Sequence, residues 1–315
     1  MPARSELATA LGDVPILVFV NRAAGRRRAH SHLLSLRTLF ESLDLSVEFV
    51  ETGSAAELES AARRAVDQNH HVLLALGGDG TFQALVNGVY GSDVMVGILP
   101  TGGGNDFAAA LGLPNDPVAA AQMMLRGKPR SVDLVRLRTA DGRTRLYAGG
   151  GGIGLDAQAA LLANGLYRRL PGRLRYVASA LHAFSKHSPL KVRLEFPGTD
   201  FPPAESISLL AGVLNTPTYG GGVRLAPDAR IDDGLLQVVL VEYLGFLSVL
   251  KVLPRLMGSG ELRTSRIKRW GVRSVRISAD RPCLFHGDGE ILGSAPVEIE
   301  VVPNAIEVLS PLKNE

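Results

Sequence analysis

The residues best suited to chemistry lie in one stretch, Leu73 to Gly88, which reads Leu-Leu-Ala-Leu-Gly-Gly-Asp-Gly-Thr-Phe-Gln-Ala-Leu-Val-Asn-Gly. Its apolar start predicts a buried strand, the glycines break that run, and the spacing after Thr81 predicts a helix to Val89. Backbone N–H groups at such a junction can bind a phosphate, and glycine lets the anion approach closely. Asp79, inside the turn, suits a metal ligand or a base beside phosphates. It suits equally well a cap of the following helix, and the turn alone leaves both interpretations open.

The elements that would position this turn alternate between strand and helix. Such alternation predicts a parallel sheet with helices on both faces, and ligands then bind at the carboxyl ends of the strands. The expected strands are Pro15–Val20, Ser46–Val50, Leu73–Leu76 and Val94–Leu99, and the expected helices are Arg26–Leu43, Ala55–Gln68, Thr81–Val89, Ala108–Leu111 and Pro117–Arg126. We therefore expect four turns to converge on one edge of the sheet: Asn21–Gly25, Thr52, Gly77–Thr81 and Gly102–Asp106.

The pattern changes after Gly127-Lys-Pro129, where strands follow one another with few helices between them. This order predicts a β-rich second domain, an antiparallel sandwich or barrel-like stack. We place the first domain at residues 1–129 and the second at 130–302, and residues 303–315 could complete the first. The expected strands of the second domain are Val132–Arg138, Arg145–Ala148, Lys191–Phe196, Ser206–Leu214, Leu235–Val241, Val272–Ser278 and Val297–Val302; its expected helices are Asn164–Ser185 and Gly245–Met257, and Ala305–Leu309 could return to either domain.

Composition excludes several classes of protein. The 315 residues are 46% hydrophobic and 21% charged, which fits two globular domains. The net charge of +3 suits phosphates or an anionic membrane surface, but basic repeats interleaved with aromatics are missing, so we expect no nucleic-acid partner. Cys283 is the single cysteine, which excludes an intramolecular disulfide and fits a reducing cytoplasm. Without a signal core or a membrane-spanning run, we expect a soluble cytoplasmic protein.

One glycine pattern is similar to a known nucleotide-binding motif but incomplete, and the histidines form no metal-binding pattern. Gly149–Gly154 satisfies G-x-G-x-x-G, yet the acidic residue expected about twenty positions later is missing from Leu170–Arg175, which disfavours a dinucleotide site. Asp156 is interpreted as a helix-start residue. The seven histidines are scattered without metal-ligand spacing, so each is interpreted as a surface or core residue.

Several motifs, taken together, resemble the diacylglycerol kinase catalytic domain of bacterial lipid kinases, to which sphingosine and ceramide kinases are similar. The core Gly77–Thr81 alone would also fit NAD kinases and phosphofructokinase relatives. The motifs appear in the family's order between Ile16 and Leu309: Gly77–Thr81 with Asn87-Gly88, Pro100–Phe107, Asn215–Gly222, Ala226–Leu236 and Asp288-Gly-Glu290. The resemblance implies a three-layer α/β domain with a parallel sheet, like that of NAD kinase and phosphofructokinase, followed by an antiparallel β-sandwich domain.

The resemblance implies ATP-dependent phosphorylation of a lipid hydroxyl, with Mg²⁺ bridging the phosphates, at a site between the domains. Glu290 matches the family's proton acceptor; Asp79 is the other candidate base or holds the catalytic Mg²⁺, and Asp288 supports one of these roles. Asp288-Gly-Glu290 alone would be typical of a hairpin turn. The nucleotide-binding residues implied by the likeness are Asn21, Arg22, Ala23, Ala24, Gly25, Thr52, Gly77, Gly78, Asp79, Gly80, Thr81, Phe82, Gln83, Gly103 and Asn105.

Gly103 departs from the family pattern, which has Thr or Ser at that position. A hydroxyl contact to phosphate is then lost, unless Thr101 or a backbone N–H replaces it. The resemblance also implies a structural Mg²⁺ in the second domain, held by the Asp233 carboxylate and the backbone carbonyls of Arg230 and Leu235. An ordinary acidic turn joining two strands is the alternative there.

The partners expected from the resemblance are ATP and a lipid at a membrane surface, with peripheral contact at the inner face, and a homodimer stays open. Gly245–Met257, flanked by Lys251 and Arg255, and Arg263–Trp270 could rest on anionic headgroups, but a core helix and a solvated loop are favoured. Two other functions stay open: a kinase of a soluble substrate such as NAD, and a nucleotide- or lipid-binding regulator without catalysis.

Overall fold

The computed structural model describes residues 14–21, 28–167, 170, 172–186, 188–245, 248 and 265–312. The chain divides into two compact units: unit 1 comprises Met1–Val132 and Asn304–Glu315, and unit 2 comprises Asp133–Pro303. The sequence placed these divisions at 129/130 and 302/303. Both divisions fall inside strands, β5 (Lys128–Thr139) and β15 (Val297–Ser310), so the chain passes between the units twice.

Unit 1 is built on a parallel sheet of short apolar strands, as the alternating pattern predicts. The strands are β1 (Ile16–Asn21), β2 (Val47–Thr52), β3 (Val72–Gly77) and β4 (Met95–Pro100), in the order β4-β3-β1-β2. The end of β15 adds a parallel strand beside β4, with Glu307 opposite Met95. The residues of β3 are all buried, as expected where both faces of a parallel sheet are covered.

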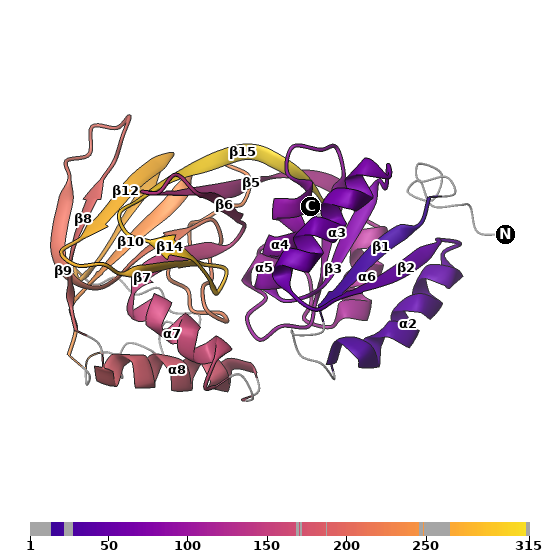
Figure 1. Ribbon diagram of the computed structural model, residues 1–315, viewed down its shortest axis with the longest axis horizontal. Helices are drawn as coiled ribbons and strands as arrows, with labels where there is room; N and C mark the ends of the chain where they lie inside the picture. Colours follow the sequence, from indigo (N-terminus) through magenta and orange to yellow (C-terminus); the bar gives the residue numbers. More distant parts are fainter. Residues whose placement is uncertain are drawn as a thin grey trace. The chain divides into compact units, whose positions relative to one another are not determined.

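Helices cover this sheet in two layers (Figure 1). They are α2 (Arg28–Ser42), α3 (Ala55–Asp67), α4 (Asp79–Val89), α5 (Asp106–Ala110) and α6 (Pro117–Leu125). Helix α3 packs against α4, and α2 packs against α6. A capping box starts α3: the Ser54 hydroxyl accepts from the Glu57 N–H, and the Glu57 carboxylate accepts from the Gly53 N–H.

Unit 2 is built from antiparallel strands, which confirms the predicted β-rich fold. Its strands are β5, β6 (Thr144–Tyr147), β7 (Gly150–Gly154), β8 (Leu190–Glu195), β9 (Ala204–Leu214), β10 (Leu236–Glu242), β11 (Ile267–Val272), β12 (Ser274–Ala279), β13 (Leu284–Gly287), β14 (Glu290–Ser294) and the start of β15. The long strand β9 pairs with β7, β8 and β10. Strand β8 shows the alternation of a half-buried strand, because Leu190, Val192 and Leu194 enter the core while the residues between them are exposed.

Some predicted elements of unit 2 were wrong. The helix predicted at Asn164–Ser185 corresponds to α8 (Gly172–Lys186), which begins later than predicted. Helix α7 (Leu155–Asn164), with Gly165 as its C-cap, was not predicted. The last strand was predicted as two pieces, yet β15 runs unbroken to Ser310.

The structure describes only part of the two segments that could rest on lipid headgroups. Trp270 lies on β11 and packs on Phe196, with ring centroids 5.0 Å apart, so it belongs to the core. Of the predicted helix Gly245–Met257, only Gly245 and Ser248 are among the described residues, and Lys251, Arg255 and Arg263 lie outside them. Within the described part of the chain, no helix combines the length and the apolar character needed to cross a membrane.

Candidate active site

The carboxyl ends of β1 to β4 carry most of the residues predicted to bind a nucleotide. Asn21 closes β1 opposite Thr52 of β2, and Gly77 closes β3 opposite Pro100 of β4. The register of the parallel strands thus brings the predicted turns to one edge of the sheet of unit 1. The predicted contacts Arg22, Ala23, Ala24 and Gly25 lie outside the described residues.

Two glycine turns at this edge meet backbone to backbone. The Thr101 N–H donates to the Gly77 carbonyl at 2.8 Å. A Cβ added at Gly102 would lie 2.7 Å from the Cα of Gly78, so this position has no room for a side chain. The N-cap of helix α4 is Gly78, which provides no side-chain cap. Backbone N–H groups at such a helix start can bind a phosphate.

Asp79 fastens the two turns together. Its carboxylate accepts from the backbone N–H of Asp106 at 3.2 Å and of Phe107 at 3.1 Å, at the start of α5. Burial and then the charge of Asp106 raise the pKa of Asp79 to about 6, although the backbone N–H groups lower it. Asp79 is therefore a helix cap, but it caps α5 rather than the helix α4 in which it lies.

Asn105 shapes the second turn, in which Gly103 lies. Its backbone is left-handed, with φ of 59°. Its Oδ1 accepts from the Gly102 N–H at 3.0 Å, and its Nδ2 donates to the Gly102 carbonyl at 3.1 Å. Asn105 thus holds the loop around Gly103 closed.

Several of the other predicted nucleotide contacts are buried. Phe82 and Gln83 are buried, and Phe82 stacks on Phe107 with ring centroids 4.6 Å apart, so Phe82 supports the turns from the core. The hydroxyls of Thr52 and Thr101 are buried and find no hydrogen-bond partner among the described residues. A buried hydroxyl without a partner costs about 1–3 kcal/mol. These two hydroxyls therefore leave unused hydrogen-bonding capacity at the carboxyl edge of the sheet.

In unit 2, Asp288 and Gly289 form the turn between β13 and β14. Both residues have positive φ, 52° and 87°, as in the type I′ turn that Asp-Gly favours in a two-residue hairpin. The Asp288 carboxylate accepts three backbone N–H groups, from Ala148 at 2.8 Å, Gly149 at 2.9 Å and Gly150 at 3.1 Å. These hydrogen bonds of Asp288 hold the turn against the start of β7.

Glu290 follows this turn as the first residue of β14, and it is exposed. Its carboxylate makes no hydrogen bond among the residues that the structure describes. Desolvation raises the pKa of Glu290 above its ordinary value, and the charge of His286 opposes that rise. A carboxylate with a raised pKa is a stronger base, which is what proton removal from a hydroxyl needs.

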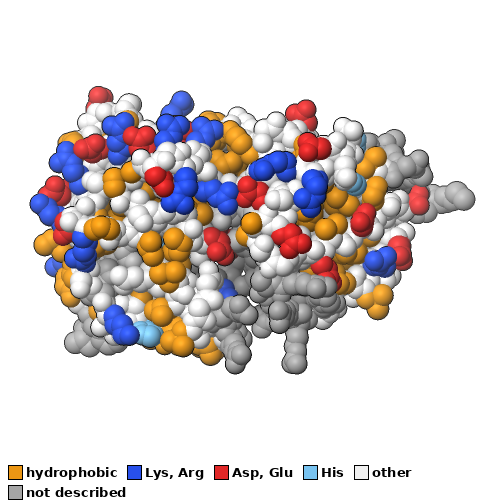
Figure 2. All heavy atoms as spheres, viewed as in Figure 1, with side chains coloured by type: hydrophobic (Ala, Val, Ile, Leu, Met, Phe, Trp, Pro, Cys, Tyr) orange, Lys and Arg blue, Asp and Glu red, His pale blue; other side chains and the backbone are white. Residues whose placement is uncertain are grey.

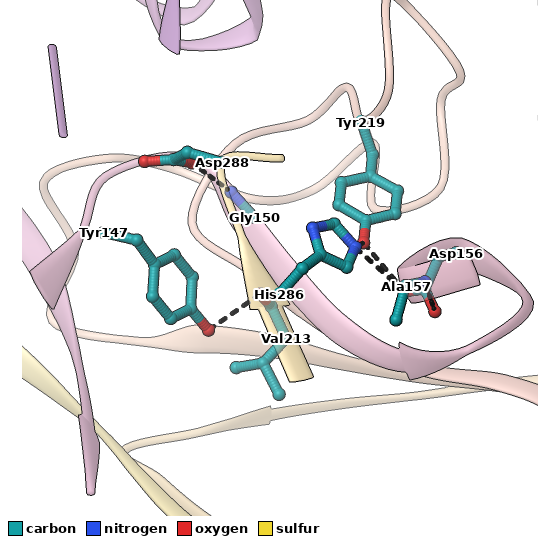
Figure 3. A network of polar contacts seen from close by, with 8 residues as sticks. All are labelled: Tyr147, Gly150, Asp156, Ala157, Val213, Tyr219, His286 and Asp288. Atoms are coloured by element: carbon teal, nitrogen blue, oxygen red, sulfur yellow. Dashed lines mark hydrogen bonds and ion pairs between the residues drawn. The ribbon is translucent and has the colours of Figure 1, made fainter. Parts of the chain in front are cut away.

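Beside this turn lies a network that the sequence did not predict (Figure 3). The Tyr219 hydroxyl donates to Asp156 Oδ2 at 2.8 Å and is hydrogen-bonded to His286 Nε2. His286 Nε2 lies 3.5 Å from the same carboxylate oxygen, and His286 is 5% exposed. The signal was present in the sequence, because His286 precedes Asp288 by two residues and Tyr219 lies in the Asn215–Gly222 motif.

The glycine run that imitates a dinucleotide fingerprint is strand β7, and close packing explains its glycines. A Cβ at Gly150 would lie 2.8 Å from the Tyr219 ring, and one at Gly149 would lie 2.9 Å from Asp288 Oδ1. A Cβ at Gly152 would overlap the Asp156 carboxylate. The run therefore makes room for Asp288, Tyr219 and Asp156.

The residues predicted for a structural metal lie in one tight turn. Asp233 Oδ1 accepts from the Leu235 N–H at 3.0 Å, and Asp133 Oδ2 accepts from the Gly234 N–H at 2.7 Å. The remaining predicted ligand is the Arg230 carbonyl. Across the described ranges, no three side chains of His, Cys, Asp or Glu gather as a metal cluster. A metal here would depend on one carboxylate, backbone carbonyls and water, a set that suits Mg²⁺.

Comparison with known families matches both units. The model described as "Diacylglycerol kinase catalytic domain" matches residues 15–137. The model described as "YegS C-terminal NAD kinase beta sandwich-like domain" matches residues 151–310.

Individual relatives agree with these matches. The chain is 30% identical over 261 residues to "Diacylglycerol kinase" of Mycobacterium tuberculosis, covering 82% of this chain and 83% of the relative. It is 29% identical over 280 residues to "Probable lipid kinase YegS-like" of Stenotrophomonas maltophilia, covering 85% and 87%. A solved diacylglycerol kinase structure from Bacillus anthracis superposes with a TM-score of 0.71 at 18% identity, covering 94% of this chain and 96% of that one, which shows a shared fold.

Proposed function

The chain belongs to the diacylglycerol kinase catalytic-domain family and is a lipid kinase, and from this premise we propose that it transfers the γ-phosphate of ATP to a hydroxyl of a diacylglycerol-like or related lipid, with Mg²⁺. One observation carries the assignment of the base. Three backbone N–H groups hold Asp288, and they leave Glu290 as the exposed carboxylate at the end of a fixed turn.

We propose that the nucleotide binds at the carboxyl edge of the sheet of unit 1. Three observations support this placement: the uncapped start of α4, the side-chain-free approach of Gly78 and Gly102, and the unpartnered Thr52 and Thr101 hydroxyls. Both oxygens of Asp79 accept backbone N–H groups, so in this proposal Asp79 positions the turns, and a bound Mg²⁺ would take most of its ligands from phosphate and water. When bound, Mg²⁺ neutralises charge on the phosphates.

The reaction then follows from the position of Glu290. Its carboxylate takes the proton from the lipid hydroxyl while that oxygen forms a bond to the γ-phosphorus. The bond from the γ-phosphorus to the bridging oxygen breaks, ADP leaves, and Glu290 later releases its proton to water. Positioned proton transfer of this kind contributes about 10²–10⁴-fold to rates, and the pKa of Glu290, raised by desolvation, makes its carboxylate a stronger base for this task.

We propose further that unit 2 meets its lipid at a membrane surface, at the inner face of the cell membrane. The helix pair α7 and α8, with the turn between them, exposes apolar side chains, and Figure 2 shows hydrophobic side chains in this region. Leu166 is 69% exposed and Leu174 is 63% exposed, and Leu161 is also exposed. Such side chains can enter the outer part of a bilayer. Homodimer formation stays a prediction.

The test is a transfer assay with radiolabelled ATP, in which lipid extract in vesicles and NAD are compared as acceptors. We expect label on lipid and none on NAD. The variant Glu290→Gln should lower the rate of transfer by at least about a hundredfold and leave nucleotide affinity unchanged. The exposed Glu300→Gln in the same unit is the matched control. Wild-type turnover in Glu290→Gln would refute Glu290 as the base. Label on NAD alone would show that the acceptor is a soluble molecule and not a lipid.

A further inference from the structure

The network of Asp156, Tyr219 and His286 takes no part in the reaction proposed above, yet it lies beside the Glu290 turn. Its three residues come from separate elements: Asp156 from the first turn of α7, Tyr219 from the loop after β9, and His286 from β13. The side chains of His286 and Asp156 are 6% and 7% exposed, and burying such polar groups costs free energy unless each is hydrogen-bonded. A network of this kind therefore calls for a functional explanation.

The direction of each hydrogen bond follows from counting hydrogens. The Tyr219 hydroxyl has one hydrogen, which it donates to Asp156 Oδ2. His286 Nε2 must then donate its own hydrogen to the Tyr219 oxygen. This fixes the orientation of the imidazole, while the His286 Nδ1 is buried without a partner among the described residues. The ring of His286 is thus held from one side, by Tyr219 with Asp156 behind it.

The chain around β7 is shaped to seat this network. The glycines Gly150 and Gly152 leave the space that the Tyr219 ring and the Asp156 carboxylate occupy. Strand β13, with His286, pairs with β7 so that His286 lies opposite Gly152. A side chain at either glycine would displace a member of the network.

The residues around this network also hold the turn that carries Glu290 in place. His286 pairs with Ile291 across the hairpin, and Gly287 pairs with Glu290 itself. At the far end of α7, Asn164 Nδ2 donates to the Gly289 carbonyl at 2.8 Å. Helix α7 thus holds the hairpin at two points, through Asp156 at its start and through Asn164 at its end.

We propose that His286 is a positioning residue for the lipid kinase reaction: held by Tyr219 and Asp156, it fixes the end of β13 and thereby the place of the Glu290 carboxylate. This inference rests on the proposed function, because it takes Glu290 as the base. It adds an electrostatic role as well, since the charged form of His286 opposes protonation of Glu290.

Other ionisable groups surround the same turn. Tyr147 on β6 is buried and has its pKa raised further by burial and by Asp288, so it stays neutral. Burial raises the pKa of Cys283, just before β13, to about 11. The remaining ionisable groups are Asp156 on α7, Tyr219 in the loop and Asp288 in the turn. Only His286 among the described residues acts on the Glu290 pKa by its charge.

Four variants separate position from charge. His286→Leu removes both the donor and the charge, and Tyr219→Phe removes the acceptor of the His286 hydrogen bond. His286→Gln keeps an N–H donor but cannot carry a charge. His182→Gln is the matched control, because His182 on α8 also pairs with a tyrosine hydroxyl, Tyr167 at 3.0 Å. Fluorescence of Trp270, the single tryptophan, reports folding of unit 2 in each variant.

The measurement is the pH profile of lipid phosphorylation, with Glu290→Gln as the reference for loss of the base. We expect His286→Leu and Tyr219→Phe to lower kcat by about 10–100-fold, since a 1 Å displacement of a reacting group has effects of that order. His286→Gln should recover most of kcat. In His286→Gln and His286→Leu alike, the acid limb should move to higher pH, because the charge that lowers the Glu290 pKa is gone.

Each contrary result has its own meaning. Wild-type kcat and an unmoved acid limb in His286→Leu would overturn the inference, as would a His286→Gln enzyme as slow as His286→Leu. An equal loss in His182→Gln would assign the effect to any lost tyrosine–histidine pair and so also overturn it. Should His286→Leu fail to fold, Tyr219→Phe and His286→Gln carry the test. An active Glu290→Gln enzyme would instead refute the proposed base.

Discussion

Replacement of Asp79 by asparagine should change how stability depends on pH. The pKa of Asp79 is raised from 3.8 to about 6, chiefly by burial and then by the charge of Asp106. The folded protein therefore holds this proton up to about pH 6, whereas the unfolded chain loses it near pH 4. Stability from this group is present below the unfolded pKa and is lost as pH rises through the folded pKa.

The magnitude follows from the shift of about 2 pKa units, which corresponds to about 3 kcal/mol at 1.36 kcal/mol for each unit. Asp79→Asn does not titrate, but it keeps only one acceptor for the N–H groups of Asp106 and Phe107. We expect the variant to be less stable than the wild type at pH 4, by about 1–3 kcal/mol. Between pH 4 and pH 7 the wild type loses the stability that the Asp79 proton provides, so its free energy of unfolding should fall by about 3 kcal/mol relative to that of the variant.

The assay is urea unfolding at several pH values, followed by far-ultraviolet circular dichroism for the helices, with Trp270 fluorescence reporting unit 2 separately. Separate signals are needed because two units need not unfold in one step. Asp116→Asn is the control, since Asp116 also accepts a backbone N–H at a helix start but is exposed. A difference between Asp79→Asn and wild type that stays constant from pH 4 to pH 7 would refute the argument.

Two further predictions concern the glycine turn and the metal. Gly102→Ala should weaken ATP binding by about 1–3 kcal/mol, because the new Cβ would lie 2.7 Å from the Cα of Gly78 and force the turns apart; nucleotide titration measures this, and unchanged affinity would contradict it. Mg²⁺ should raise the thermal midpoint of unit 2, by an amount equivalent to about 2.7 kcal/mol at a hundred times its dissociation constant, and Asp233→Asn should abolish most of this gain. Fluorescence of Trp270 follows that transition, and an equal Mg²⁺ effect in Asp233→Asn would place the ion elsewhere.

Local pattern was sufficient to predict the sheet of unit 1 and the edge where its turns meet. Apolar runs that end in glycine, such as Leu73–Gly78, indicate strand, turn and helix together. The role of Asp79 could not be predicted in this way. Its partners Asp106 and Phe107 lie on another turn, and only the folded backbone brings those N–H groups to the carboxylate.

Glycines were harder to interpret in unit 2 than in unit 1. Gly149–Gly154 was compared with a nucleotide motif because glycine often marks a phosphate site, but here glycine makes room for the side chains of Tyr219, Asp156 and Asp288. His286, like the other histidines, was interpreted as a surface or core residue, since sequence spacing shows no partner for it. The sequence missed this network for one reason: the groups in contact come from segments far apart in the chain.

The path of β15 has a consequence for biosynthesis. Residues 304–310 complete the sheet of unit 1 beside β4, with Val308 opposite Val96, yet they leave the ribosome only after all of unit 2. Domains usually mature in the order of synthesis. Here the unit that emerges first must wait for its edge strand, so a chain cut before Asn304 could close unit 2 but would leave the flank of β4 bare.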